Sequence, residues 1–148
     1  MTGEPALSES YRAVAASVPL ARRAVMCFAR SAGVSEEQLE AVGLASSEAV
    51  TNVVQHAYEG PGGRVHVEVA VAGDDLWVLI SDDGLGLRVG SKTYGLGVGL
   101  ALIACVADTF SVLKRSSGGT ELQMRFGLQA PQTPKSEQRL VSSAQTPA

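Results

Sequence analysis

Apolar and polar residues alternate over residues 64–71, which read RVHVEVAV. In an extended chain the valines of this segment share one side and the intervening residues share the other, so the pattern predicts a strand with one buried face. A GDD turn follows, and the apolar run LWVLISDD returns over residues 76–83. The two segments are therefore predicted to form an antiparallel hairpin.

Helical patterns precede this hairpin. Ser17 and Pro19 mark the start of a helix that is predicted to run to Gly33, a residue that commonly ends helices. A capping box, SEEQ at residues 35–38, then opens a longer helix that we expect to reach residue 58. The tract EGPGG separates this helix from the hairpin.

A glycine-rich loop follows the hairpin and leads into an apolar helix predicted over residues 99–108. Two further strands, FSVLKR at 110–115 and TELQMRF at 120–126, flank the turn SSGG, and a short edge strand is predicted over residues 11–15. These elements predict an α+β fold, a two-layer sandwich with helices packed on one face of a mostly antiparallel sheet.

Length and composition indicate one globular domain, because the chain has 148 residues, of which 45% are hydrophobic and 18% charged. We expect this domain to cover residues 9–128. Residues 1–8 are polar and are expected to be flexible. Residues 129–148 are rich in Pro, Ser and Gln and are expected to form a disordered tail.

The formal net charge of −3, with no basic cluster longer than two residues, argues against direct nucleic-acid binding. The first residues do not resemble a signal peptide, and no apolar stretch approaches the ~20 residues of a membrane span. The sequence therefore predicts a cytoplasmic protein without a membrane anchor. Cys27 and Cys105 fit no metal-binding spacing and are predicted to be two buried free thiols.

The long predicted helix carries Glu48 and Asn52 one turn apart, on the same helix face. They lie nearly opposite the apolar face, beside Ala41 and Ala45. The apolar face comprises Leu39, Val42, Val50, Val53 and Ala57. The pair is either a partly exposed polar stripe or a carboxylate and an amide that face a ligand, and the alanines beside it leave room for close approach.

Three more polar points follow along the chain. Asp82 shares its parity with the buried positions of its strand, so its carboxylate is predicted to point under the helices, where it needs donors. Gly84 and Gly86 leave backbone room for a flat group, although an ordinary Asp-Gly turn has the same pattern. Thr120 has the inward parity of the last strand, so its hydroxyl is expected near Asp82.

The stretch GLGVGL opens the third helix and leaves free N–H groups of the kind that bind phosphate. It comprises Gly95, Leu96, Gly97, Val98, Gly99 and Leu100. It is neither a Walker A loop, because GxxxxGK[ST] is absent, nor a Rossmann fingerprint, because its spacing is GxGxG.

The order of these parts is more specific than any one of them: ExxxN on a helix, DxGxG after a strand, GxGxGL opening a helix, and GGT before a strand. This order resembles the GHKL ATP-binding fold shared by gyrase, the heat-shock chaperone ATPase, mismatch-repair ATPases and histidine kinases. With Glu heading the first motif in a stand-alone domain, the chain is similar to the bacterial anti-sigma factor serine/threonine kinases. The resemblance covers roughly residues 10–127.

The resemblance implies that ATP and Mg²⁺ bind here. Asn52 would ligate Mg²⁺, and Glu48 would be the general base toward an attacking hydroxyl. Asp82 would accept a hydrogen bond from the adenine amino group, with Thr120 nearby. Gly84 and Gly86 would shape the adenine pocket. The stretch from Gly95 to Leu100 would supply backbone to the phosphates.

One departure from the family concerns the segment between Gly86 and Gly95, which has only eight residues where relatives commonly have more. Lys92 in this segment either contacts phosphate or is simply solvated. His56 extends the Glu48–Asn52 stripe by one turn and is expected to have a structural or supporting role.

The resemblance implies a kinase that phosphorylates an anti-anti-sigma-type protein, and a sigma factor is a further partner that such a protein can sequester. An ATP-binding switch that holds a partner without phosphotransfer is the alternative. A sensor histidine-kinase catalytic domain is disfavoured because Glu, not His, heads the first motif. A homodimer through the N-terminal edge strand is a further expectation.

Overall fold

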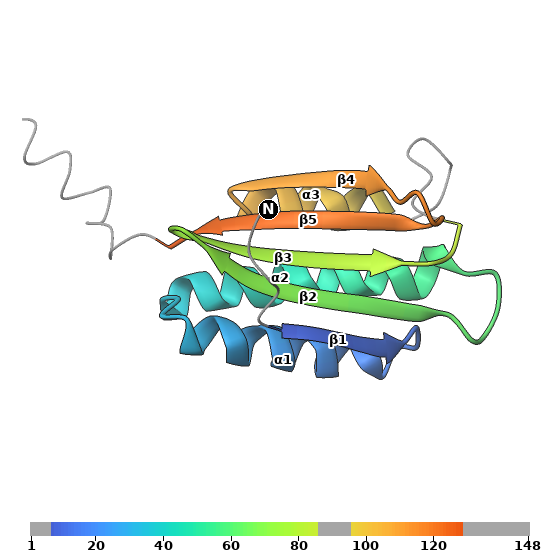
Figure 1. Cartoon of the computed structure of the whole chain (residues 1–148), viewed down its shortest axis with the longest axis horizontal. Helices are drawn as coiled ribbons and strands as arrows, with labels where there is room; N and C mark the ends of the chain where they lie inside the picture. Colours follow the sequence, from blue (N-terminus) through green and yellow to red (C-terminus); the bar gives the residue numbers. More distant parts are fainter. Residues whose placement is uncertain (1–6, 86–95, 129–148) are drawn as a thin grey trace, which may run out of the picture.

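The computed structural model describes residues 7–85 and 96–128 (Figure 1). The described helices are α1 (Ser17–Ser31), α2 (Glu36–Asn52) with a π-helical turn η1 (Val53–Ala57) directly after it, and α3 (Leu96–Val106). The described strands are β1 (Leu7–Arg12), β2 (Arg64–Ala72), β3 (Asp75–Asp82), β4 (Thr109–Lys114) and β5 (Thr120–Gly127).

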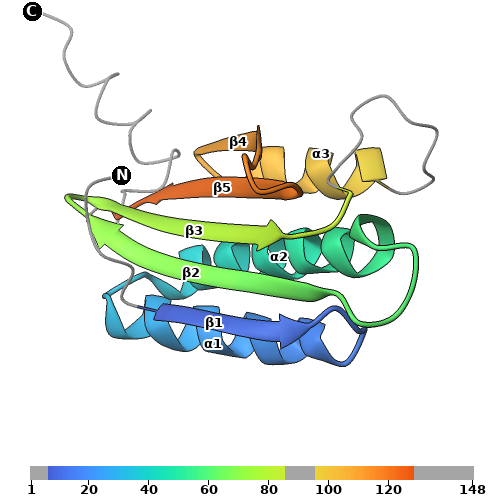
Figure 2. The same ribbon diagram turned by 45° about the vertical axis from the view of Figure 1, so that its right-hand side comes forward.

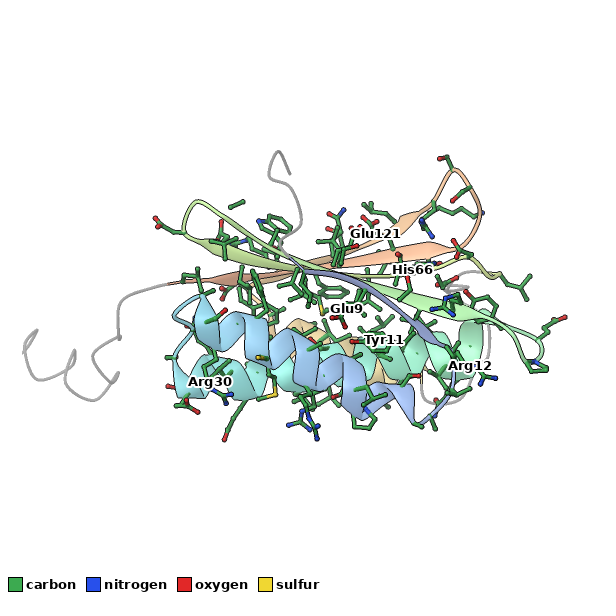
Figure 3. The ribbon with its side chains drawn as sticks, turned by 60° about the horizontal axis from the view of Figure 1, so that its bottom comes forward. Glu9, Tyr11, Arg12, Arg30, His66 and Glu121 are labelled. Atoms are coloured by element: carbon green, nitrogen blue, oxygen red, sulfur yellow. The ribbon has the colours of Figure 1, made fainter. Side chains whose placement is uncertain are left out.

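The strands form one antiparallel sheet in the order β1-β2-β3-β5-β4. The three helices lie side by side on one face of it, with α1 near β1, α2 in the middle and α3 near β4 (Figures 1 and 2). Strand β2 has one buried face, as its alternating sequence predicted. Its valines at 65, 67 and 69 are buried, while His66 lies on the face of the sheet away from the helices (Figure 3). The predicted α+β two-layer fold is confirmed.

Helix α2 forms the centre of the helical layer. Its N-terminus is capped as expected, since the Ser35 hydroxyl accepts the Gln38 backbone N–H at 3.2 Å. The apolar face predicted for this helix is buried against the sheet; it comprises Leu39, Val42, Val50, Val53 and Ala57. The hairpin and the last two strands are also confirmed, with bounds within a few residues of those expected.

The N-terminal strand differs from the prediction. It spans Leu7–Arg12 rather than 11–15, so residues 7 and 8 belong to the sheet and not to a flexible terminus. Its sequence, LSESYR, has little apolar alternation, and the strand exists because it pairs with β2 from Leu7 opposite Val69 to Arg12 opposite Arg64. After Arg12 the chain turns directly into α1. Local pattern could not reveal a strand defined by its partner.

Both cysteines are free, as predicted, but the prediction of their burial was wrong. Cys27 on α1 and Cys105 on α3 are exposed, because neither lies on the buried face of its helix. No helix in the described part of the chain is long and apolar enough to cross a membrane.

Candidate functional site

Asp82 is the last residue of β3, and the structure buries it completely at the end of the sheet, beside the start of β5. Its Oδ1 atom accepts the Gly84 backbone N–H at 2.9 Å, and the carboxylate also accepts the backbone N–H of Thr120. Thr120 is buried too. The inward direction predicted from strand parity is therefore correct for both residues, and they adjoin.

Burial raises the pKa of the Asp82 carboxyl above its ordinary value, because the ionised form loses solvation. The N–H groups of Gly84 and Thr120 and the nearby Arg115 guanidinium act in the opposite direction without overcoming burial. A carboxylate that is kept ionised in a buried position has a strong tendency to recruit another donor.

The raised pKa has a consequence for stability that can be measured. A group whose pKa is higher in the folded than in the unfolded protein contributes stability below its unfolded pKa and loses that contribution as pH rises through the folded pKa. Asp82→Asn removes this titration. As pH falls from 7 toward 4, we therefore expect the unfolding free energy of the variant to decrease relative to wild type. Urea unfolding of both proteins across that range measures the difference, and a constant difference would contradict it.

Two glycines allow the backbone to close around Asp82. An ideal Cβ built at Gly84 would lie 2.0 Å from the Ala57 carbonyl oxygen, and one at Gly119 would lie 2.0 Å from the Asp82 carbonyl oxygen. Gly119 also has φ of +83°, a conformation that other residues rarely adopt. The π-helical turn η1 contributes to this closure, because its last residue, Ala57, accepts the Leu85 N–H at 2.8 Å.

Glu48 and Asn52 converge on the first turn of α3. An ideal Cβ built at Gly99 would lie 3.2 Å from both Glu48 Oε2 and Asn52 Oδ1. Gly99 is buried, so the absence of a side chain there lets the carboxylate and the amide approach the helix backbone together. Asn52 is only 4% exposed, which excludes a solvated position for this residue.

The Asn52 Nδ2 group has no hydrogen-bond partner among the described residues, although it is buried. The same holds for His56 Nε2, one turn further along. Unpaired buried polar atoms are rare in folded proteins and mark either strain or a missing partner such as an ion, water or ligand. The orphaned Asn52 amide beside Gly99 is thus a candidate ligand contact.

A metal ion at this position would be held mainly by groups from outside the protein. Within residues 7–85 and 96–128, no group of three or more His, Cys, Asp and Glu side chains is gathered as a metal site. The Asn52 side-chain oxygen is a hard ligand of the type that Mg²⁺ prefers, and Mg²⁺ usually keeps water and phosphate oxygens for its other positions. The residues present therefore fit a nucleotide-bound Mg²⁺.

The remaining predicted contacts divide into two groups. Gly86, Gly95 and Lys92 lie outside the described residues. In α3, Leu96 is the first residue, Gly97 is exposed, Leu100 is half-buried and the Val98 side chain is 67% exposed. The Val98 side chain does not join Glu48 and Asn52, so only its backbone is suited to a ligand there.

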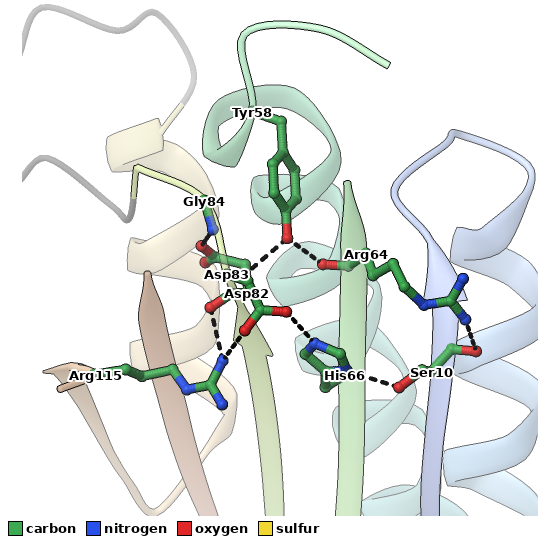
Figure 4. Close-up of polar contacts among 8 residues, drawn as sticks. All are labelled: Ser10, Tyr58, Arg64, His66, Asp82, Asp83, Gly84 and Arg115. Atoms are coloured by element: carbon green, nitrogen blue, oxygen red, sulfur yellow. Dashed lines mark hydrogen bonds and ion pairs between the residues drawn. The ribbon is translucent and has the colours of Figure 1, made fainter. Parts of the chain in front are cut away.

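Sequence reasoning missed Tyr58 and Arg115, which hold the turn after β3 (Figure 4). The Tyr58 hydroxyl accepts the Asp83 backbone N–H at 2.9 Å, and Arg115 Nη1 donates to the Asp82 carbonyl at 2.9 Å. Both residues come from segments distant in sequence, the end of η1 and the turn after β4. Nothing in the local pattern distinguishes them from the other Tyr and Arg residues of the chain.

Residues 11–126 match the family described as "Histidine kinase-like ATPase domain". The "Anti-sigma F factor" of Clostridium kluyveri is 28% identical over 116 residues, covering 71% of this chain and 82% of that protein. The "Serine-protein kinase RsbW" of Listeria monocytogenes serotype 4a is 36% identical over 81 residues, covering 54% of this chain and 52% of that protein.

A solved structure has the same fold. The crystal structure of the RsbU and RsbW domains of a Mycobacterium tuberculosis protein aligns with 84% of this chain at a TM-score of 0.64 and 20% sequence identity. The aligned part spans 32% of that longer chain. At this identity the likeness bears on the fold alone.

Proposed function

The chain belongs to the histidine kinase-like ATPase domain family, and on that premise we propose that it is an ATP- and Mg²⁺-dependent serine/threonine protein kinase of the anti-sigma-factor type. The names of the relatives from Clostridium and Listeria support this choice within the family. In the proposed reaction the hydroxyl of a protein acceptor attacks the γ-phosphorus of ATP.

The observation that carries the proposal is the convergence of Glu48 and Asn52 on Gly99. It brings a carboxylate and an amide oxygen of the kind that can ligate Mg²⁺ to the first turn of an apolar helix, and such a helix start suits phosphate. A kinase needs a base, a metal ligand and a phosphate cradle within reach of one another. An ATP-binding protein without transfer chemistry has no need for the carboxylate.

Each residue has one task in this reaction. The Asp82 carboxylate accepts a hydrogen bond from the adenine amino group, and Gly84 and Gly119 let the neighbouring backbone approach Asp82 closely. Asn52 holds Mg²⁺, which when bound neutralises charge on the phosphates. Glu48 takes the proton of the acceptor hydroxyl as the new O–P bond forms, and the bond between the γ-phosphorus and the leaving oxygen of ADP breaks.

The proposed acceptor is a small anti-anti-sigma-type protein with an exposed serine, and a sigma factor is a second proposed partner that the chain sequesters. This role assigns the protein to the cytoplasm, where sigma factors act. The edge position of β1 suits self-pairing of two chains, because a strand at a sheet edge presents unpaired backbone groups.

Incubation with γ-labelled ATP, Mg²⁺ and candidate partner proteins tests the proposal. We expect label on a serine or threonine of one partner, identified by mass spectrometry. If the chain binds ATP and a partner tightly and transfers no label, the protein is instead an ATP-dependent switch. The partners to try first are proteins encoded beside this gene.

Asn52→Ala is expected to abolish the Mg²⁺ dependence of ATP binding, because Asn52 supplies the side-chain oxygen nearest to Gly99 apart from the Glu48 carboxylate. Calorimetric titrations of ATP with and without Mg²⁺ measure this. Thr51→Ala is the matched control, since Thr51 is its neighbour on the same helix and is half-buried. A full Mg²⁺ response in the Asn52 variant would remove this residue from the metal site.

A further inference from the structure

The peptide unit between Asp82 and Asp83 is held at both ends by side chains. Its carbonyl accepts a hydrogen bond from Arg115 Nη1 at 2.9 Å, and its N–H donates to the Tyr58 hydroxyl at 2.9 Å (Figure 4). A peptide unit is planar, so two bonds from opposite edges fix its rotation. The Asp82 Cα atom lies at one corner of this plane, so the two bonds fix the point from which the side chain departs, and the N–H groups of Gly84 and Thr120 hold the carboxylate itself.

Each of the two holding side chains is itself anchored. Arg115 Nη1 also donates to Asp83 Oδ1 at 2.7 Å, which forms an ion pair. The Tyr58 hydroxyl donates to the Arg64 carbonyl on β2 at 2.5 Å. The Tyr58 ring occupies the space beside Gly63 and Gly84, since an ideal Cβ at these glycines would lie 2.3 Å and 3.0 Å from ring atoms.

Asp83 connects this arrangement to the outer face of the sheet. Its Oδ2 atom lies 2.5 Å from His66 Nε2 on β2, and His66 Nδ1 lies 2.6 Å from the Ser10 hydroxyl on β1. A carboxylate only accepts, so Nε2 carries the proton. The neighbouring His66 and Arg115 lower the pKa of the Asp83 carboxyl, so Asp83 stays ionised as the common anchor.

We propose that Arg115 and Tyr58 are positioning residues for nucleotide recognition, which fix the Asp82–Asp83 peptide so that the Asp82 carboxylate selects adenine over guanine. Adenine presents an amino group where guanine presents a carbonyl oxygen. A carboxylate held in one direction attracts the adenine amino group and repels the guanine carbonyl oxygen. A carboxylate that is free to rotate discriminates less between the two bases. The inference rests on the proposed role of Asp82 in binding ATP.

Two conservative variants test it, each with a control matched on this chain. Arg115→Gln removes the donor to the Asp82 carbonyl. Its control is Arg125→Gln, because Arg125 forms the same kind of Asp pair, with Asp75 at 2.9 Å, and the two Arg side chains are 29% and 30% exposed. Tyr58→Phe removes only the hydroxyl, and its control is Tyr11→Phe, whose hydroxyl donates to Glu9.

Calorimetry with ATP and with GTP gives an affinity for each and a selectivity ratio. We expect Arg115→Gln and Tyr58→Phe each to weaken ATP binding about tenfold and to reduce the ATP/GTP ratio by a similar factor, while the two controls match wild type. Removing one hydrogen bond to a group that must stay ordered has an effect of this order. The double variant should lose less than the product of the two single losses, since both act on one peptide unit.

The outcomes separate this inference from the kinase proposal, because the readout is binding and not transfer. A wild-type chain that binds ATP without transferring phosphate would contradict only the kinase. Unchanged ATP affinity and ATP/GTP ratio in both folded variants would overturn the positioning role. So would equal losses in the variants and their controls, because that result indicates general destabilisation.

Discussion

Glu48→Gln is expected to lower single-turnover phosphoryl transfer by ~10²–10⁴-fold, the usual contribution of a general base. The change preserves the size of the side chain and its helix propensity, and it removes the ability to accept a proton at neutral pH. ATP binding should persist, since the groups proposed to hold adenine and phosphate lie on β3, β5 and α3. The measurement is transfer to the partner beside calorimetric ATP affinity.

Glu40→Gln is the control for this variant, because Glu40 lies two turns earlier on α2 and is exposed. Transfer at the wild-type rate in Glu48→Gln would exclude a catalytic role for Glu48. Absence of transfer in wild type and variant, with unchanged partner affinity, would favour the switch alternative. Loss of ATP binding in the variant would indicate that Glu48 contributes to the nucleotide site itself.

Gly119→Ala is expected to produce the largest loss of structure at the site. A Cβ atom at this position would lie 2.0 Å from the Asp82 carbonyl oxygen and 2.9 Å from Asp82 Oδ1, and the backbone has φ of +83°. The positive φ costs about 1–3 kcal/mol in a residue with a side chain. The overlap adds roughly another 1–3 kcal/mol and must displace the Asp82 backbone. We therefore expect reduced stability together with loss of ATP binding.

Gly118→Ala separates the two contributions. Gly118 has φ of +95°, but an ideal Cβ there meets no atom within 4 Å. Its substitution should incur only the backbone cost and should leave ATP affinity near that of wild type. Chemical unfolding and calorimetry of both variants measure this. Equal effects of the two substitutions on ATP affinity would contradict a specific contact between Gly119 and Asp82.

Short-range periodicity accounts for what the sequence by itself determined. The valine alternation of β2 and the apolar run of β3 predicted the hairpin and its buried face, and the parity of Asp82 followed from its place in that run. The spacing of four residues brought Glu48 and Asn52 to one face of α2. These inferences succeeded because helix and strand geometry repeat every few residues, so neighbours along the chain determine direction.

Tertiary structure alone decided what lies opposite each of these groups. The local pattern left two alternatives for Asn52, a partly solvent-exposed position or a position that faces a ligand. The packing of α3 against α2 buries Asn52 beside Gly99. β1 is a strand because β2 pairs with it, and the helix periodicity did not reveal that both cysteines face outward.

Tyr58 and Arg115 are the clearest case of this limit. They meet the same peptide unit from chain positions 57 residues apart, the difference between 115 and 58. The Arg115 hydrogen bond depends on the sheet order β1-β2-β3-β5-β4, which brings the turn after β4 beside the end of β3, and the Tyr58 hydrogen bond depends on the packing of η1 against β3. Periodicity carries no information on such contacts, because they depend on how separate elements pack and not on the spacing of residues within one element.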